Sequence, residues 1–298
     1  MIIYVGISYN RPKFCPNATW NATAVTFAPT AVVGTNPAAL FVDSNNTVYI
    51  ANTQYSWVSV WPEGSTASIK NISSGLQNPY GMFVTSNGDM YIDNGDTNKR
   101  VDKWSVNATN STPVMFQCGR CADIYITTDN RLYCAMRFSH QVVAKSISDN
   151  LNVWTRMAGT GVAGSTSTTL NNPTEIYVME NRDLYVADYQ NSRIQKFPYG
   201  QLAATTVDTT PFTLNQPEGL TFDADGYIFI SDCANCRLLG SSQYGFRCIV
   251  GCSGCGSSAT QLYNLADIRF DSYGNLYVND FLNSRIQKFT LLQNTCGK

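Results

Sequence analysis

The sequence contains few charged residues and almost no histidine. Charged side chains make up 14% of its 298 residues and the formal net charge is −1, whereas roughly a quarter of residues are charged in typical soluble proteins. A chain so nearly neutral has no long-range field that would attract phosphates, so we expect no nucleic-acid partner. Its single histidine, His140, cannot build a multi-histidine metal site, and we predict no cofactor.

Long apolar runs and a recognisable leader are also missing. No stretch approaches the ~20 apolar residues that span a bilayer, so we expect no membrane span. The opening segment Met1–Ile7 is too short for the apolar core of a signal peptide and has no basic residue before that core. We therefore interpret the chain as a mature or partial product, in which Met1 need not be the genetic start.

What the sequence does contain is cysteine and N-glycosylation sequons. The 10 cysteines, an even number, indicate an oxidising compartment. The N-x-Ser/Thr sequons agree with that compartment, and all of them precede Pro113. The candidate glycosylation residues are Asn17, Asn21, Asn45, Asn71, Asn107 and Asn110. These features predict a secreted glycoprotein that carries N-linked glycans.

An internal repeat predicts the fold class. Ungapped similar segments begin at Pro37, Pro79, Cys121, Pro173, Pro217 and Leu265. Each holds an apolar strand, a tight Asn/Asp/Gly turn and a second strand with an aromatic residue at one fixed position. The starts lie roughly 40–50 residues apart, which fits one four-stranded blade per repeat. Small sheets cannot bury both faces alone, so we predict an all-β, six-bladed β-propeller over residues 23–298.

The two ends of the chain are expected to meet in the sixth blade. The last repeat ends after three strands, and Thr23–Phe27 is predicted to supply the missing outer strand. Cys15 and Cys296 would then be neighbours, and a disulfide that closes so large a loop contributes several kcal/mol. Residues 1–22 form an N-terminal extension, whose alternately apolar leader Met1–Asn10 could pack on its own ring or act as an assembly arm on a neighbour's blade edge.

The later repeats resemble those of the NHL-repeat family. The family pattern Pro-x-Gly, followed by Leu-Tyr-Val-x-Asp-x-x-Asn-x-Arg-Ile-Gln-x-Phe, is matched best by Leu184–Phe197 and Leu276–Phe289, with Tyr227–Leu238 next. The chain is also similar to secreted, cysteine-containing NHL-repeat proteins of small aquatic invertebrates. The resemblance covers about residues 20–292 and implies a six-bladed ring of NHL type.

Two sets of repeated polar residues are interpreted as structural. In blades four to six the recurring aspartates are expected to cap turns, and the recurring arginines to brace adjacent loops. These residues are Asp188, Asp232, Asp280, Arg193, Arg237 and Arg285. A ligand-binding aspartate ring is the weaker alternative. Asp43, Asp223 and Asp271 recur at another position and are explained by turn chemistry.

The cysteines allow two interpretations. Cys233-x-x-Cys236 and Cys252-x-x-Cys255 have the spacing of a four-cysteine zinc site. Disulfides between the blade-five turn and the following loop are favoured, because Cys248 would be an odd fifth thiol beside a metal. A local bridge is expected in blade three. The disulfide candidates are Cys15, Cys118, Cys121, Cys134, Cys233, Cys236, Cys248, Cys252, Cys255 and Cys296.

Propeller topology sorts these residues onto two faces. Asn45, Asn107 and Asn110 fall in turns of one face, whereas most of the cysteines fall in loops of the other. We predict that the cysteine-bearing face is the binding surface.

The resemblance also bears on activity. NHL propellers include lyases and esterase-like hydrolases that use metal-bound histidines or carboxylates, and His140 is the one histidine here. We therefore predict no catalytic residue. The favoured function is an extracellular, non-catalytic binding or scaffold module for a protein or glycan partner, copies of itself included. The alternatives are a subunit of an extracellular filament or matrix assembled through the N-terminal strand, and a propeller hydrolase or lyase.

Overall fold

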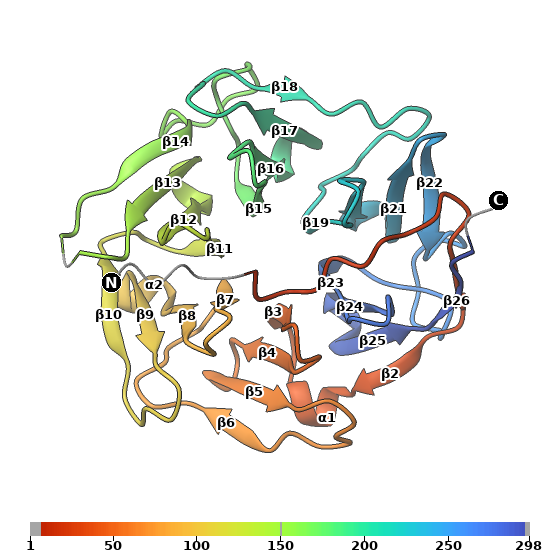
Figure 1. Cartoon of the computed structure of the whole chain (residues 1–298), viewed down its shortest axis with the longest axis horizontal. Helices are drawn as coiled ribbons and strands as arrows, with labels where there is room; N and C mark the ends of the chain where they lie inside the picture. Colours follow the sequence, from red (N-terminus) through yellow and green to blue (C-terminus); the bar gives the residue numbers. More distant parts are fainter. Residues whose placement is uncertain (1–6, 150, 296–298) are drawn as a thin grey trace.

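The predicted ring of six blades is confirmed by the computed structural model (Figure 1). The structure describes residues 7–149 and 151–295. Each blade is a four-stranded antiparallel sheet, in which the first strand lies at the central channel and the fourth at the rim. Because a lone sheet of this size leaves both faces exposed, the blades are stable only when packed against their neighbours around the ring.

The first three blades follow the repeat in chain order. Blade one consists of β3 (Pro37–Val42), β4 (Val48–Asn52), β5 (Trp57–Trp61) and β6 (Lys70–Ile72). Blade two consists of β7 (Met82–Val84), β8 (Met90–Asp93), β9 (Arg100–Trp104) and β10 (Thr112–Phe116). Blade three consists of β11 (Cys121–Ile126), β12 (Arg131–Met136), β13 (Gln141–Ser146) and β14 (Thr155–Gly159).

The last three blades differ mainly in their outer strands. Blade four consists of β15 (Pro173–Val178), β16 (Leu184–Asp188), β17 (Arg193–Phe197) and β18 (Thr205–Thr206). Blade five consists of β19 (Leu220–Phe222), β20 (Ile228–Asp232), β21 (Arg237–Ser242) and β22 (Gly245–Val250). Blade six consists of β23 (Leu265–Phe270), β24 (Leu276–Asp280), β25 (Arg285–Phe289) and, from the other end of the chain, β2 (Val25–Ala28).

The ring is closed as the sequence predicts. Strand β2 pairs antiparallel with β25, so that Val25 lies opposite Lys288. The predicted closing strand, Thr23–Phe27, is therefore confirmed to within two residues. Cys296 lies outside the described residues, so the Cys15–Cys296 bridge stays a prediction.

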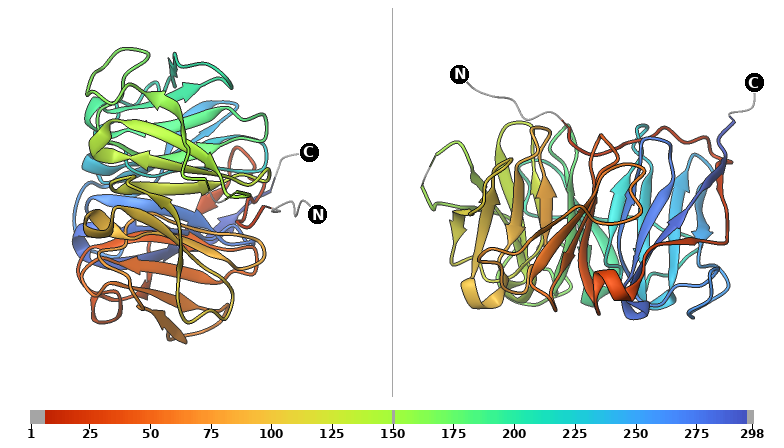
Figure 2. Two further views of the ribbon diagram at one scale, coloured as in Figure 1. Left: turned by 90° about the vertical axis from the view of Figure 1, so that its left-hand side faces the viewer. Right: turned by 90° about the horizontal axis from the view of Figure 1, so that it is seen from below.

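A second pairing at the seam was not predicted. Strand β1 (Thr19–Trp20) pairs with β26 (Leu291–Gln293) in a small separate sheet. Before β1, residues 7–18 run as an extended segment across one face of the disc (Figures 1 and 2). We call this segment the strap. It binds the ring of its own chain over several blades.

The two faces of the disc are built from different connections. The strap face carries the turns between first and second strands, such as the turn after β3, and the turns between third and fourth strands. The loop face carries the inter-blade loops and the short helical turns after the second strands. Figure 2 shows the strap along one edge and helices α1 (Thr30–Val33) and α2 (Gly95–Asn98) along the other. The remaining helical turns are η1 (Arg137–Ser139), η2 (Tyr189–Asn191), η3 (Cys233–Asn235) and η4 (Phe281–Asn283).

The recurring aspartate and arginine residues connect the elements of each later blade. The buried Asp188 carboxylate accepts the Asn171 amide at 2.6 Å and pairs with Arg193 Nε at 2.7 Å. Arg193 also donates to the carbonyl oxygens of Ser165 and Thr166 in the preceding loop. Blades five and six repeat the ion pair with nitrogen–oxygen distances of 2.7 and 2.6 Å. These contacts agree with the structural interpretation of both residues.

The other recurring aspartates accept hydrogen bonds from backbone amides of their own turns. Asp43 Oδ1 accepts the backbone amides of Asn45 and Thr47 at 2.9 and 2.8 Å. Asp223 and Asp271 make the same pair of contacts in their own turns.

Within the described part of the chain, no helix has the length and apolar character needed to cross a membrane.

Candidate functional site

The central channel is lined by alternate residues of the six inner strands. Because side chains alternate along a strand, the third and fifth residues of each repeat point to the same side. The third positions contribute Ala39, Asp123, Glu175 and Asp267 to the channel lining. The fifth positions contribute Phe41, Phe83, Tyr125, Tyr177, Thr221 and Arg269. The channel therefore changes from aromatic near the strap face to ionisable in its middle.

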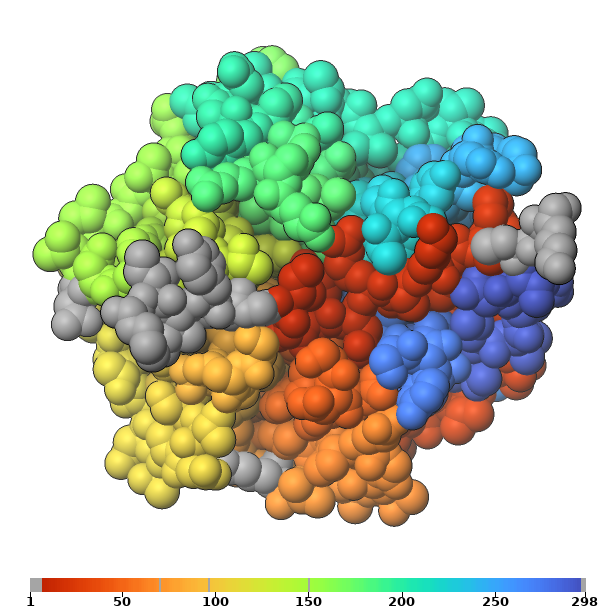
Figure 3. All heavy atoms as spheres, viewed as in Figure 1, coloured from red at the N-terminus to blue at the C-terminus, as the bar shows by residue number. Residues whose placement is uncertain are grey.

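The strap occupies the aromatic end of the channel. Tyr9 lies edge-on to Phe83, Tyr125 and Tyr177, with ring centroids 6.3, 6.1 and 5.9 Å away. Its hydroxyl lies 2.5 Å from the Tyr125 hydroxyl and donates to the Tyr177 hydroxyl at 3.0 Å. Figure 3 shows the strap lying across the centre of this face. One end of the channel is thus filled by the chain's own side chain.

Polar contacts hold the strap on the turns of three blades. Arg11 donates to the Asp223 carbonyl at 3.0 Å and pairs with Glu180 at 2.9 Å. Asn10 donates to the Asp43 carbonyl at 2.7 Å. These residues come from blades five, four and one, so the strap spans the disc.

An aromatic anchor fixes the other end of the strap. Phe14, only 5% exposed, packs against Trp20, Phe229 and Phe270. The indole nitrogen of Trp20 also donates to the Gly274 carbonyl at 2.8 Å. Large aromatic rings buried in this way hold an extended segment firmly.

Three carboxyl groups and one guanidinium meet in the middle of the channel. Arg269 Nη1 lies 2.5 Å from a carboxylate oxygen of Glu175 and 2.5 Å from one of Asp267. Asp123 completes the group, and all three acids are more than nine-tenths buried. We call these four residues the channel cluster. The formal charges of the acids exceed that of the single arginine, so complete ionisation would leave unpaired buried charge.

Burial controls protonation in the channel cluster. Loss of hydration raises the pKa of Asp123 to about 7, although the Arg269 guanidinium opposes the rise. Burial likewise raises the pKa values of Glu175 and Asp267 above the usual range, again opposed by Arg269. A carboxyl group with a pKa near neutrality can hold or release a proton under ordinary conditions, which is a common property of functional sites.

Two of these acids also connect neighbouring blades. Asp123 Oδ2 accepts the Ile176 amide at 3.1 Å, and Asp267 Oδ2 accepts the Leu40 amide at 2.9 Å. Each bond runs from one inner strand to the next, so part of the cluster's role is structural. Sequence reasoning missed these residues. The available signal was that Asp123, Glu175 and Asp267 stand at the third position of the repeat, where the NHL pattern has glycine.

The loop-face end of the channel has a polar mouth. Arg137, from η1, donates to the Tyr80 hydroxyl at 3.1 Å and lies 3.7 Å from Glu218 Oε1. Burial raises the pKa of Glu218, and the arginine opposes the rise. A cavity of about 20 Å³ lies between Tyr80, Glu218 and the three acids of the channel cluster, which is enough for about one water molecule. The strap does not reach this end.

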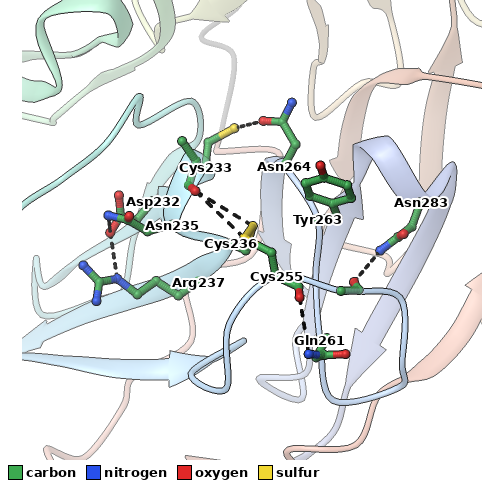
Figure 4. The surroundings of a disulfide bond; sticks show 12 residues. Asp232, Cys233, Asn235, Cys236, Arg237, Cys255, Gln261, Tyr263, Asn264 and Asn283 are labelled. Atoms are coloured by element: carbon green, nitrogen blue, oxygen red, sulfur yellow. Dashed lines mark hydrogen bonds and ion pairs between the residues drawn. A yellow bond between two sulfur atoms is a disulfide. The ribbon is translucent and has the colours of Figure 1, made fainter.

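Among the described residues, three disulfides brace blade three and the region from blade five to the following loop. Cys121 bonds to Cys134 within blade three. Cys236, at the end of the blade-five turn, bonds to Cys255 in the loop toward blade six (Figure 4), as the favoured disulfide interpretation expected. A short bridge joins Cys248 to Cys252.

The cysteines of the zinc alternative are therefore not available together. Cys236, Cys252 and Cys255 are each in a disulfide. Cys233 is a buried thiol that donates toward Asn264 (Figure 4). Cys118 is the other buried thiol among the described residues, and burial raises its pKa to about 12. Such thiols are poor nucleophiles.

Comparison with known proteins supports the resemblance to the NHL repeat, but not the finer resemblance to invertebrate proteins. The family model of the NHL repeat matches residues 170–197, which contain most of blade four. The chain is a six-bladed β-propeller that carries an NHL repeat. No match to a curated protein sequence was found.

The ring is also similar to solved structures that include a lyase, a binding protein and a protein of unknown function. A Bacteroides thetaiotaomicron protein of unknown function has a TM-score of 0.67 at 15% identity, covering 97% of this chain and 76% of that one. Virginiamycin B lyase from Staphylococcus aureus has a TM-score of 0.59 at 12% identity, covering 90% and 99%. An auxiliary nutrient binding protein from Bacteroides ovatus has a TM-score of 0.60 at 13% identity, covering 98% and 78%. At these identities the similarity shows the fold alone.

The predicted glycosylation residues all lie on the surface of the ring. Asn17 and Asn21 lie in or just after the strap. Turns of the strap face hold Asn45, Asn107 and Asn110, and Asn71 lies in β6 at the rim. All six residues are exposed.

The single histidine makes one hydrogen bond to a residue before blade four, because His140 Nδ1 accepts the Asn172 amide at 3.1 Å.

Proposed function

We propose that this NHL propeller is an extracellular, non-catalytic binding or scaffold module that recognises a protein or glycan partner through its loop face. The observation that carries the proposal is the asymmetry of the channel. Tyr9 fills the strap-face end, whereas Tyr80, Arg137 and Glu218 surround an end that the strap does not reach. Ligands of ring-shaped folds commonly bind where the channel opens between loops.

The extracellular setting is supported by covalent chemistry. Three disulfides are typical of proteins that mature in an oxidising compartment. The exposed sequon residues would place glycans on the strap, the strap face and the rim near β6. Glycans at those positions leave the loop face uncovered for a partner.

Side chains of the loop face have the character of an interface. Phe138, in η1, is 59% exposed, and the guanidinium of Arg120 lies over its ring at 5.6 Å and over the Tyr80 ring at 4.9 Å. Aromatic residues and arginine are enriched where proteins bind partners. The Cys236–Cys255 bridge holds a neighbouring loop, which lowers the entropy lost on binding.

Paired aromatic variants test which face binds. Phe138→Asp alters the loop face, and Tyr273→Asp is its matched control, because Tyr273 is a 65% exposed aromatic in the blade-six turn of the strap face. Both proteins are applied to a printed glycan array and to an array of purified extracellular proteins. We expect Phe138→Asp to reduce the retained signal about tenfold and Tyr273→Asp to leave it unchanged. The opposite ranking, or no ligand on either array, would contradict the proposal.

Assembly through the N-terminal strand receives less support. Residues 8–10 belong to the predicted arm, yet the Ser8 carbonyl accepts the Ser44 amide at 2.8 Å and Tyr9 fills the chain's own channel. Electron microscopy of the native protein distinguishes the two functions. Filaments would favour assembly, whereas monodisperse single rings would count against it.

A hydrolase or lyase is the second alternative, and the channel cluster is the observation in its favour. Asp123 has a pKa near neutrality and lies beside other acids, as a proton-transferring residue would. The test is turnover of ester, lactone and glycoside substrates by the wild type and by Asp123→Asn. Activity that the variant loses would favour an enzyme over a binding module.

A further inference from the structure

We propose that a groove at the rim, between blades three and four, binds an extended peptide segment that carries an apolar side chain followed by a carboxylate. One wall of the groove is Thr155–Met157 of β14. The other is formed by Arg182 and Leu184 together with residues 197–202 after β17. The site goes beyond the proposed function, because it lies on the rim rather than at the mouth of the channel.

The groove exists because blade four has an unusually short outer strand. β18 pairs only with Gln195 and Lys196, so the end of β17 at Phe197 has no outer neighbour. The connection over residues 198–204 arches away and leaves a space of about 290 Å³. Met157, Leu184 and Leu202 line this space, and Leu202 is 45% exposed. The recess can therefore accept an apolar side chain.

The main chain beside the recess favours an extended ligand. β14 is the last strand of its sheet and pairs only with β13. An edge strand presents unpaired N–H and C=O groups, and an added peptide strand can satisfy them. The exposed Val153, two residues before β14, extends the apolar surface along the same edge.

The charge of the groove defines the second requirement. The exposed Arg156 guanidinium makes no hydrogen bond or ion pair with any described residue, whereas Arg182 is engaged by Asp129 at 3.0 Å and by the Tyr199 hydroxyl at 3.3 Å. None of the described residues that line the groove is acidic. A carboxylate on the ligand would therefore meet an unpaired arginine without a competing acid, which is the pairing arginine makes best.

Access to the groove is compatible with glycosylation. The predicted glycan sites all precede Pro113, and blade three begins at Cys121, so no sequon lies in the two blades that form the groove. A peptide partner and the predicted glycans can occupy the same ring.

Fluorescence anisotropy with designed peptides tests the proposal on the full chain. The probe is a labelled octapeptide of alternating valine and threonine with one central aspartate, and matched peptides carry asparagine or lysine there. We expect the aspartate peptide to bind at least about tenfold more tightly than the asparagine peptide. Arg156→Glu should reverse the preference toward the lysine peptide, and Leu202→Asp should weaken every peptide. Lys99→Glu, at an exposed cation on blade two, is the matched control and should change nothing.

Several results would overturn the proposal. Equal binding of the aspartate and asparagine peptides, or no effect of Arg156→Glu in a protein with an unchanged melting temperature, would remove the charge requirement. A heparin hexasaccharide that binds where the peptides do not would reassign the groove to saccharides. Tighter peptide binding after deletion of residues 1–6 would show that the chain's own apolar segment is the occupant. Phe138→Asp should leave peptide binding intact, so a failure here is distinguishable from a failure of the loop-face proposal.

Discussion

Asp123 combines a favourable contact with an unfavourable environment. Its Oδ2 accepts the Ile176 amide, which joins blade three to blade four, while burial raises its pKa to about 7. In the unfolded chain the same group titrates near 3.8. Between these two values the folded protein binds a proton that the unfolded chain does not. The contribution of Asp123 to stability is therefore present at low pH and is lost as pH rises from about 4 to about 7.

Asp123→Asn should remove this pH dependence. Asparagine keeps an oxygen for the Ile176 amide but cannot ionise, so the variant should gain stability over the wild type as pH rises, by up to about 1.4 kcal/mol per pH unit across that window. Thermal unfolding from pH 4 to pH 8 measures the difference. Asp149→Asn, at an exposed position, is the control and should follow the wild-type profile. Parallel profiles for wild type and Asp123→Asn would contradict the assignment.

The role of a side chain could be predicted where its hydrogen bonds stay within its own turn. It could not be predicted where its partners come from other blades. Asp43 bonds to amides within four residues, so its role can be deduced from local sequence. Glu175 and Arg269 are 94 residues apart, and their contact exists only after the ring closes. Alternation along the inner strands could have placed both in the channel, but not against each other.

At the scale of elements, the ion pair between Asp280 and Arg285 joins the second and third strands of blade six. The Asp280 carboxylate is fully buried and also accepts the Tyr263 amide at 2.7 Å. Removal of the arginine would leave the buried carboxylate without a counter-charge, although Tyr263 and Asn283 would still donate hydrogen bonds to it. In blade one the same two positions hold uncharged residues, Asn52 and Trp57.

Arg285→Ala should therefore lower the free energy of unfolding by about 3 kcal/mol. The double variant Asp280→Asn/Arg285→Trp, which copies blade one, should lose less because no unpaired charge remains. Chemical denaturation of the three proteins measures both values. A double variant that is less stable than Arg285→Ala would show that the arginine acts mainly through its loop contacts.

The strap depends on its aromatic anchor more than on its ion pairs. Phe14 is buried among aromatic rings, so Phe14→Ala should cost about 3–4 kcal/mol through lost burial and a cavity. The adjacent Lys13 forms an exposed ion pair with Asp225, so Lys13→Ala should leave the free energy of unfolding almost unchanged. Urea unfolding of both variants checks the contrast. Similar losses would mean that the strap is held electrostatically.

The strands that belong to the repeat could be predicted, whereas the segment outside the repeat could not. The repeat places the strands of all six blades, and the missing fourth strand of blade six points to the chain's other end, so β2 could be predicted. The path of the strap could not. Its partners are turns of several blades, and no local periodicity specifies which turns a segment outside the repeat will cross.

At the scale of the whole molecule, six similar blades form a disc with unlike faces. The strap and the exposed Asn45 and Asn107 lie on one face, and η1 to η4 with the Cys236–Cys255 bridge lie on or near the other. Propeller topology alone predicted the placement of these asparagines and cysteines on opposite faces, but not the face on which the strap lies. It did not predict that Tyr9 would fill one end of the channel, because that contact joins the N-terminal segment to blades three and four.

The most direct test of the account is hydroxyl-radical footprinting with the ligand found on the arrays. Aromatic rings report on each face, with the exposed Phe138 and the half-buried Tyr189 on the loop face and the exposed Tyr244 and Tyr273 on the strap face. We predict that the ligand protects Phe138 and Tyr189 from oxidation and leaves Tyr244 and Tyr273 as reactive as in the free protein. Protection of Tyr244 and Tyr273 with Phe138 still reactive would contradict the central claim that the loop face is the binding surface.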